Sequence, residues 1–170
     1  SLAQEIESRK WPVVYFNAEC NLGAAGNHAK RLAISADHQI DWCYFLNHDG
    51  HLNFENVLEM RSTAEKYDSV GAVYPLIYNK TRTLPWEDGR TSLTPSAQRL
   101  SATRPDDSVD EPVLWGSSNG ALYSLAPYRK GLRIWTEVWH GYEDLGYGIL
   151  LNQNKWRQFV CKRAVLENAY

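Results

Sequence analysis

The chain has 170 residues, of which 44% are hydrophobic and 22% charged, proportions that are typical of a globular domain with one core. The formal net charge of −2 argues against a nucleic-acid-binding protein, for which a basic surface is expected. The three cysteines lack metal-ligand spacing, so we expect free thiols in a reducing compartment. No apolar stretch is long enough to span a membrane and no signal peptide is recognised, so we expect a cytoplasmic protein.

The first segments predict a helix, a strand and a second helix. Residues 2–9 have the spacing of a short amphipathic helix, and 13–16 form an apolar run typical of a buried strand. Residues 21–28, NLGAAGNH, are a loop of small residues that opens a helix to about Ala36. Such loops let backbone N–H groups approach a phosphate or ribose, although close helix–strand packing explains two glycines equally well.

The stretch WCYFLNHDGHL is the centre of the predicted fold. Residues 42–46 are apolar without interruption, which indicates a strand buried on both faces in the middle of a parallel sheet. The next residues, 47–51, are polar or turn-forming. Ligands of open α/β sheets bind beyond the carboxyl ends of the strands, and a carboxylate there suits a hard cation. The alternative is a turn that merely leaves the strand.

The alternation then continues and predicts a parallel sheet. Residues 54–67 have helical apolar spacing, and 70–75 form another buried strand. Strands alternating with helices indicate right-handed crossovers between parallel strands. Residues 79–112 are rich in proline and polar residues and have no sustained periodicity, which predicts an active-site flap.

The second half carries an acidic pair. A helix is predicted from Tyr142 to about Asn154, with Glu143 and Asp144 in its first turn. The helix dipole alone favours acids there, so a helix-start preference is the alternative to a catalytic role. The expected strands of this half are 113–115 with 120–123, 156–160 and 164–166. The stretch 135–141 is irregular and aromatic; such rings stack on sugars and bases but also fill cores.

Three segments stand in one order along the chain: NLGAAGNHAKRLAIS, then FLNHDGHL, then SNGALYSLAPYRKG followed by HGYEDLGYGILLNQNKW. This order resembles the inverting GT-A glycosyltransferases that include bacterial rhamnosyl- and galactofuranosyl-transferase-like enzymes. The first segment resembles the family's Asn-x-Gly segment, and the second its DXD site in the variant that starts with Asn. The third resembles the acceptor-side strand and the Glu-Asp helix.

The resemblance implies a GT-A, Rossmann-like α/β fold with a mostly parallel central sheet flanked by helices. Two family strands would precede residue 1, so we expect this sheet to be N-terminally incomplete. One domain, 1–170, would comprise a donor half (1–78), the flexible loop (79–112) and an acceptor and catalytic half (113–170). Many relatives associate with the inner face of the membrane through parts that lie outside this sequence.

The resemblance also implies an activity, the transfer of a sugar with inversion from a UDP- or dTDP-sugar to a glycan or lipid-linked acceptor in bacterial cell-wall or polysaccharide biosynthesis. Asp144 would be the general base, with Glu143 beside it. Asp49 would hold Mg²⁺ or Mn²⁺ on the donor diphosphate, and Glu167 would take the place of the family's metal-binding His near the end of the domain. The donor contacts implied are Asn21, Gly23, Asn27, Asn47 and Asp49.

Two other readings stay open. Asn47 in place of Asp, and the lack of a histidine near the end of the domain, fit a non-catalytic protein that binds carbohydrate or a partner on a degenerate GT-A scaffold. An α/β nucleotide-binding domain of unrelated chemistry explains the loop and the sheet but leaves Glu143 and Asp144 without a role.

Overall fold

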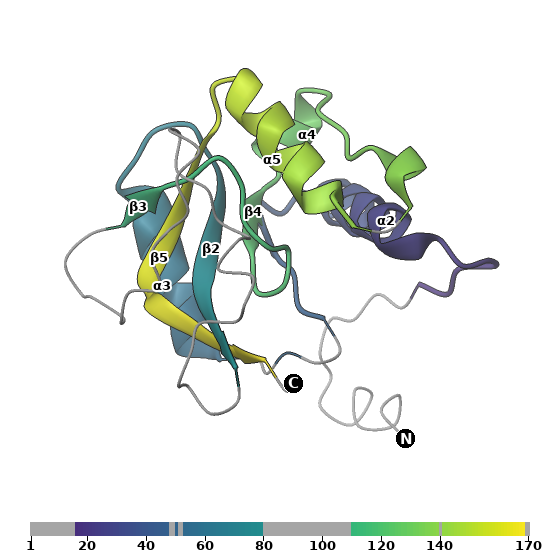
Figure 1. Ribbon diagram of the computed structural model, residues 1–170. Helices are drawn as coiled ribbons and strands as arrows, with labels where there is room; N and C mark the ends of the chain where they lie inside the picture. The colour runs from purple at the N-terminus through teal and green to yellow at the C-terminus, as the bar shows by residue number, and fades with distance from the viewer. Residues whose placement is uncertain (1–15, 48–49, 51–52, 80–109, 140, 169–170) are drawn as a thin grey trace.

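The computed structural model describes residues 16–47, 50, 53–79, 110–139 and 141–168, and Figure 1 labels its helices and strands. Within these ranges the protein is an α/β structure in which five strands form one mixed sheet. The elements are α2 (Gly23–Asp37), β1 (Trp42–Tyr44), α3 (Phe54–Glu65), β2 (Val70–Asn79), β3 (Glu111–Pro112), β4 (Leu122–Ser124), α4 (Ala126–Arg129), η2 (Thr136–Val138), α5 (Glu143–Gln153) and β5 (Arg157–Asn168).

The strand order is β1-β4-β2-β5-β3. Strand β2 pairs with β5 in parallel, whereas β4 is antiparallel to both of its neighbours and β3 is antiparallel to β5. It follows that β1, β2 and β5 point the same way and that β4 fills the space between β1 and β2 in the opposite direction. The carboxyl ends of β1, β2 and β5 therefore lie at one edge of the sheet.

The expectation of a mostly parallel sheet is wrong for the described strands. The helical crossover through α3 does leave β1 and β2 parallel, but they are not neighbours, because the later strand β4 enters between them. The expectation that β1 lies in the middle of the sheet, buried on both faces, is also wrong. Its three residues are half-buried, and β4 is its one partner among the described strands. An apolar run reports burial but carries no information about the direction of a partner strand.

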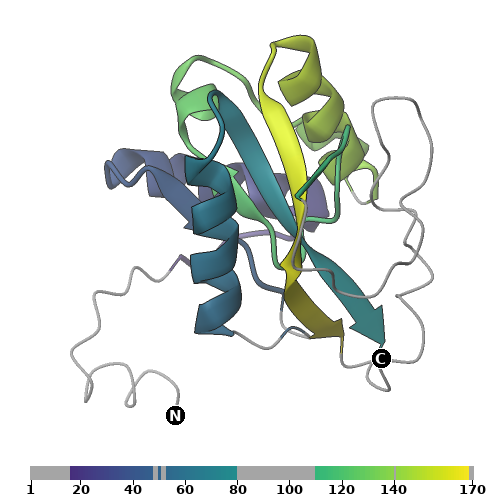
Figure 2. The ribbon, with the colours of Figure 1, turned by 90° about the vertical axis from the view of Figure 1, so that its left-hand side faces the viewer.

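Helices cover both faces of the sheet, as the two views in Figures 1 and 2 show. Successive side chains of β2 and β4 pack alternately into two hydrophobic cores, one on each face of the sheet. Val73 and Leu122 pack toward α3, whereas their neighbours Tyr74 and Tyr123 pack toward α2 and α5. Since successive side chains of a strand point to opposite faces, this alternation determines into which core each strand residue packs. The acidic pair of α5 therefore lies on the α2 side of the sheet.

Most predicted elements are confirmed, with adjusted bounds. Helices α2, α3 and α5 lie close to the predicted segments, and Asn53 caps α3 by accepting the Glu55 N–H at 2.9 Å. The two short strands expected at the end of the chain are one long strand, β5. Residues 113–115 are not a strand, and β3 precedes them at 111–112. The helix at 2–9, the strand at 13–16 and most of the 79–112 flap lie outside the described residues.

No helix in the described ranges is both long enough and apolar enough to cross a membrane.

Candidate functional site

The residues that follow β1 are hydrogen-bonded to the loop that precedes β4. The Gly120 N–H donates to the Phe45 carbonyl at 2.8 Å, and the Asn47 N–H donates to Oδ1 of Asn119 at 3.2 Å. Asn119 is buried, so its side chain acts as a fixed acceptor for the turn that leaves β1. The site thus begins at the carboxyl edge of the sheet, where ligands of open α/β sheets bind.

The same loop holds the first turn of α5. The backbone N–H of Ser118 donates to Oδ2 of Asp144 at 3.2 Å, and the Leu145 N–H donates to Oδ1 at 3.0 Å. Both carboxylate oxygens of Asp144 therefore have a backbone donor. This arrangement fixes the orientation of the carboxylate next to the end of β1.

His28 joins α2 to this cluster. Its Nε2 atom lies 3.2 Å from the Ser118 hydroxyl, and its Nδ1 atom lies 3.8 Å from Oε1 of Glu143. The imidazole also packs on the Phe45 ring, with 5.2 Å between ring centroids. Helix α2, the end of β1, the 118–119 loop and the start of α5 thus converge on one buried histidine.

Burial sets the charge of His28. Desolvation, with a smaller contribution from the positive charge of Arg31, lowers the pKa of His28 to about 4. The imidazole is therefore neutral at pH 7, and its contact with Glu143 is a polar contact between a neutral ring and a carboxylate. A neutral ring carries one N–H, so it donates through one nitrogen and accepts through the other.

The pKa of the Asp144 carboxyl is shifted upward, whereas that of His28 is shifted downward. Burial raises its pKa, and the neighbouring Glu143 carboxylate raises it further, while the N–H groups of Ser118 and Leu145 act against the rise. A carboxylate with a raised pKa is a stronger base than an ordinary aspartate at the same pH.

Glu143 leaves one oxygen unsatisfied. The side chain is buried, and its Oε2 atom has no hydrogen-bond partner among the described residues. Buried carboxylate oxygens are rarely left without a donor, because the lost hydration is not replaced. A hydroxyl group of a bound molecule, or a water, would satisfy this oxygen.

The segment predicted as a small-residue loop, 21–28, is helical from Gly23 onward, so only its first two residues precede α2. Close contacts shape this start of the helix. Oδ1 of Asn21 accepts the Gly23 N–H at 2.9 Å, and the Ala25 N–H donates to the Trp139 carbonyl at 3.1 Å. Gly23 has φ +65°, and a Cβ placed on it would lie 2.4 Å from that carbonyl oxygen. Close packing against the Trp139 segment, near α5, therefore accounts for this glycine.

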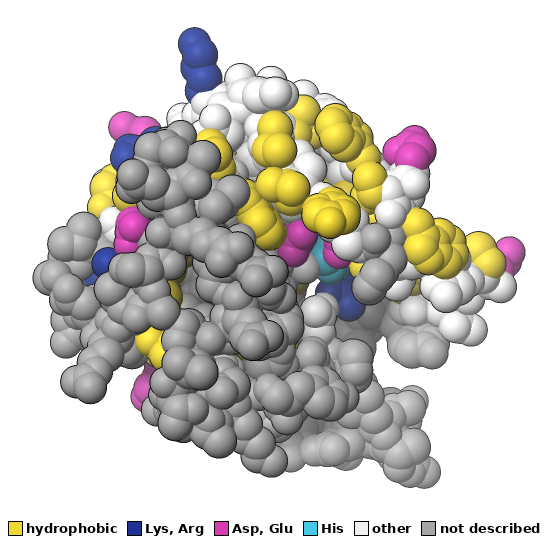
Figure 3. Space-filling model, in the orientation of Figure 1, with side chains coloured by type: hydrophobic (Ala, Val, Ile, Leu, Met, Phe, Trp, Pro, Cys, Tyr) yellow, Lys and Arg dark blue, Asp and Glu magenta, His cyan; other side chains and the backbone are white. Residues whose placement is uncertain are grey.

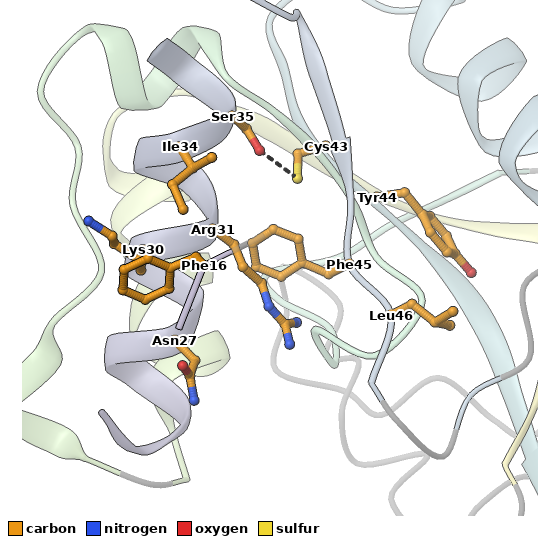
Figure 4. A pocket seen from close by; sticks show the side chains of 10 residues that line it. All are labelled: Phe16, Asn27, Lys30, Arg31, Ile34, Ser35, Cys43, Tyr44, Phe45 and Leu46. Carbon is orange, nitrogen blue, oxygen red and sulfur yellow. Dashed lines mark hydrogen bonds between the residues drawn. The ribbon is translucent and has the colours of Figure 1, made fainter. Parts of the chain in front are cut away.

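Asn27 lies in a groove of about 500 Å³ between α2 and β1. Figure 4 shows its amide and the Arg31 guanidinium pointing toward the same end of the groove. Lys30 and Arg31 contact the rings of Phe16 and Phe45, and neither cation has a carboxylate partner among the described residues.

The structure brings some predicted site residues together and separates others. Glu143, Asp144 and Asn47 meet around the 118–119 loop, whereas Asn21 is exposed at the start of α2. Glu167 lies near the end of β5, and β4 and β2 separate that strand from β1. Strands β1 and β5 are therefore three strand spacings apart, which is roughly 14 Å.

Asp49 lies outside the described residues. Among the residues that are described, no three His, Cys, Asp or Glu side chains are grouped so that they could hold a metal ion.

Three residues of the cluster were not predicted as site residues: His28, Ser118 and Asn119. His28 is the last residue of a segment predicted as an ordinary small-residue loop, and Ser118-Asn119-Gly120 is typical of a turn. The signal that distinguishes them is tertiary, since each contacts a segment far away in the sequence.

The fold and the cluster define an α/β protein with a histidine–carboxylate site at the carboxyl edge of its parallel strands. A scan of the chain against known protein families finds no match, and a search of the curated proteins finds no relative.

Proposed function

We propose that the protein is an inverting glycosyltransferase of the GT-A type, which moves a sugar from a nucleotide-sugar donor to a glycan or lipid-linked acceptor. The observation that carries the proposal is the position of Asp144. This carboxylate is half-buried, oriented by the Ser118 N–H at 3.2 Å, and located where the carboxyl end of β1 meets the first turn of α5.

Asp144 is the general base of the proposed reaction. The acceptor hydroxyl gives its proton to the Asp144 carboxylate while its oxygen attacks C1 of the donor sugar. The C1–O bond to the diphosphate breaks on the opposite face, and the diphosphate leaves with the electron pair. The raised pKa of Asp144 supports this role, because it strengthens the base without a change of residue type.

The donor is proposed to lie between the start of α2 and the end of β1, where Asn21, Gly23, Asn27 and Asn47 are found. Supporting this placement, the segments of the sequence that resemble the family converge here through His28 and the 118–119 loop. Asp49 follows β1, and its carboxylate is the type of oxygen ligand that Mg²⁺ and Mn²⁺ prefer. A divalent cation bound there would neutralise charge on the departing diphosphate.

The described carboxylates alone do not form a metal site, so the proposed metal-binding role rests on Asp49, since Glu167 lies on a strand that β4 and β2 separate from β1. No step assigned to Asp144 depends on that ion. The proposal therefore has two separable parts, a base at Asp144 and a donor site at the end of β1.

A thermal-shift panel tests the donor site. UDP, dTDP, GDP and their sugars are each added with and without Mn²⁺ to the native chain, to Asp49→Ala and to Asp68→Ala, whose carboxylate is exposed in the turn before β2. We expect stabilisation that needs both nucleotide and Mn²⁺, persists in Asp68→Ala and disappears in Asp49→Ala. Absence of any nucleotide-dependent shift in the native chain would contradict the donor site and favour the non-catalytic alternative.

A further inference from the structure

Three large aromatic side chains remain exposed beside the site. Trp135, Trp139 and Tyr142 are 56%, 52% and 74% exposed, and we refer to them as the aromatic patch. Figure 3 shows apolar side chains gathered over α5 and the adjacent η2 segment, next to a small group of acidic and histidine side chains. Other aromatic residues fill the core beneath, among them Tyr74, Tyr123 and Tyr147, whereas each residue of the patch is more than half exposed.

The patch surrounds the first turn of α5. Tyr142 directly precedes Glu143 in the chain, and a Cβ placed on Gly146 would lie 3.5 Å from the Trp135 ring. The Trp139 carbonyl accepts the Ala25 N–H, which links the patch to the start of α2. The patch therefore lies beside the turn that carries the acidic pair.

A second observation points to a bound molecule. Glu143 is 7% exposed, and its Oε2 atom has no donor among the described residues. The site thus combines flat apolar ring faces with an acceptor oxygen that lacks a partner. A sugar ring has the complementary surface, since its C–H faces are apolar and its rim carries hydroxyl donors.

We propose that the aromatic patch binds the acceptor as a neutral glycan, with sugar rings stacked on Trp135, Trp139 and Tyr142 and a hydroxyl group donating to Oε2 of Glu143. This inference rests on the proposed function, because it assigns the substrate class of the same site.

The surroundings favour a glycan over other occupants. A bilayer would draw Glu143, Asp144 and the exposed Glu137 toward apolar chains, at a large desolvation cost. A stable protein interface needs about 20 to 30 residues on each side, far more than three rings supply. A polyanion would meet the carboxylates of α5 at close range, whereas a neutral sugar would not.

The test uses ¹⁹F NMR on the full chain with 5-fluorotryptophan in place of its seven tryptophans. Trp135→Phe and Trp139→Phe assign the two patch resonances, and Trp42 and Trp156, which contact Arg61 and Lys130, serve as internal controls. The probes are neutral oligosaccharides of α- and β-linked glucose, galactose, mannose and rhamnose. Vesicles of phosphatidylcholine and phosphatidylglycerol form a separate arm.

We expect at least one oligosaccharide to shift the Trp135 and Trp139 resonances and to leave those of Trp42 and Trp156 in place. Trp135→Ala and Tyr142→Asn should each weaken binding about tenfold, because each removes one stacked ring. Asn tolerates the left-handed backbone at position 142, where φ is +68°. Phe54→Ala, which removes a 70% exposed ring on α3, should bind like the native chain.

Two outcomes overturn the inference: no shift across the whole oligosaccharide panel, or shifts of the patch resonances with vesicles alone. The thermal shift caused by nucleotide and Mn²⁺ is measured on the same preparation, so that the donor site and the aromatic patch are tested separately. Nucleotide stabilisation without a glycan response contradicts the aromatic patch alone, whereas a glycan response without nucleotide stabilisation supports the patch and contradicts the donor site.

Discussion

His28 and Glu143 lie on different helices, yet Nδ1 of the histidine is 3.8 Å from Oε1 of the glutamate, and both side chains are buried. Helix α2 carries the small-residue segment, and α5 carries the acidic pair. This contact therefore joins the two halves of the candidate site. Because the pKa of His28 is lowered to about 4, the contact exists at neutral pH without a charged histidine.

Stability should fall in mild acid through His28. The pKa of His28 is about 4 in the folded protein, against 6.5 for an unperturbed histidine. Between these values the unfolded chain binds the proton and the folded one does not, so stability is complete above pH 6.5 and decreases as pH falls toward 4. A shift of this size corresponds to about 3 kcal/mol. Urea unfolding of the native chain at pH 7 and pH 5 measures the decrease.

His28→Gln is the matched variant for this effect, since glutamine does not titrate. Subtracting the variant's profile of stability against pH from the native one removes the contributions of the other titrating groups. Among them is Asp144, whose raised pKa makes the folded protein more stable as pH falls. Parallel profiles for the two proteins between pH 7 and pH 4 would contradict the assignment to His28.

Gly23→Ala should destabilise the junction between α2 and the Trp139 segment. The backbone has φ +65°, and the added Cβ would meet the Trp139 carbonyl oxygen at 2.4 Å. Left-handed backbone costs alanine about 1 kcal/mol, and displacement of the carbonyl adds to it, so we expect a loss of about 2 to 3 kcal/mol. Denaturant unfolding measures the loss.

Gly141→Ala is the control, because φ there is +76° and no atom of the described residues lies within 4 Å of the added Cβ. Equal losses in the two variants would show that backbone conformation alone accounts for Gly23.

Local signals were sufficient for the helices but not for the sheet. The apolar spacing after Asn53 predicted α3 well, since that helix depends on its own cap and on one buried face. The position of β4 between β1 and β2 depends on pairing between distant segments, which no local pattern encodes. The same limit applies to His28, whose role arises from Ser118 and Glu143.

Strand β5 shows a different limit of prediction from the sequence. Lys162 and Arg163 interrupt its apolar pattern, which led to the prediction of two short strands. The pairing with β2 shifts register between Pro75 and Leu76, opposite these residues. An irregularity of this kind lets one continuous strand hold charged side chains that reach Glu111 and Glu59.

Asp110→Ala should destabilise the point where the chain rejoins the sheet at β3, at the end of the 79–112 segment. The buried Asp110 carboxylate accepts from Thr63 at 2.9 Å, Lys66 at 3.0 Å and Arg163 at 3.4 Å. Its removal leaves the partly buried Arg163 without one of its acceptors, so we expect a loss of about 2 to 3 kcal/mol in denaturant unfolding. Glu65→Ala, which breaks an exposed pair with Arg61, should cost less than about 0.5 kcal/mol.

Asp144→Asn and Glu143→Gln should separate catalysis from stability. Asp144→Asn keeps one oxygen that can accept the Ser118 N–H but turns an NH₂ group toward the Leu145 N–H, while it removes a carboxylate that burial disfavours. These effects oppose each other, so we expect the stability to stay within about 1 kcal/mol of that of the native chain. Glycosyl transfer should fall by about 10² to 10⁴, the usual contribution of a general base. Glu143→Gln instead points an amide N–H₂ into the position of Oε2, where no acceptor is described, at a cost of about 1 to 3 kcal/mol.

Transfer rates and urea midpoints of both variants check this contrast, once a donor is known from the nucleotide panel. If Asp144→Asn retained native transfer, the base would have to be another group, and Glu143, whose Oε2 lacks a described donor, would be the next candidate. If instead Asp144→Asn lost stability and transfer together, the carboxylate would hold the 118–119 loop against α5, because Ser118 and Asp144 are the residues through which that loop contacts the helix start.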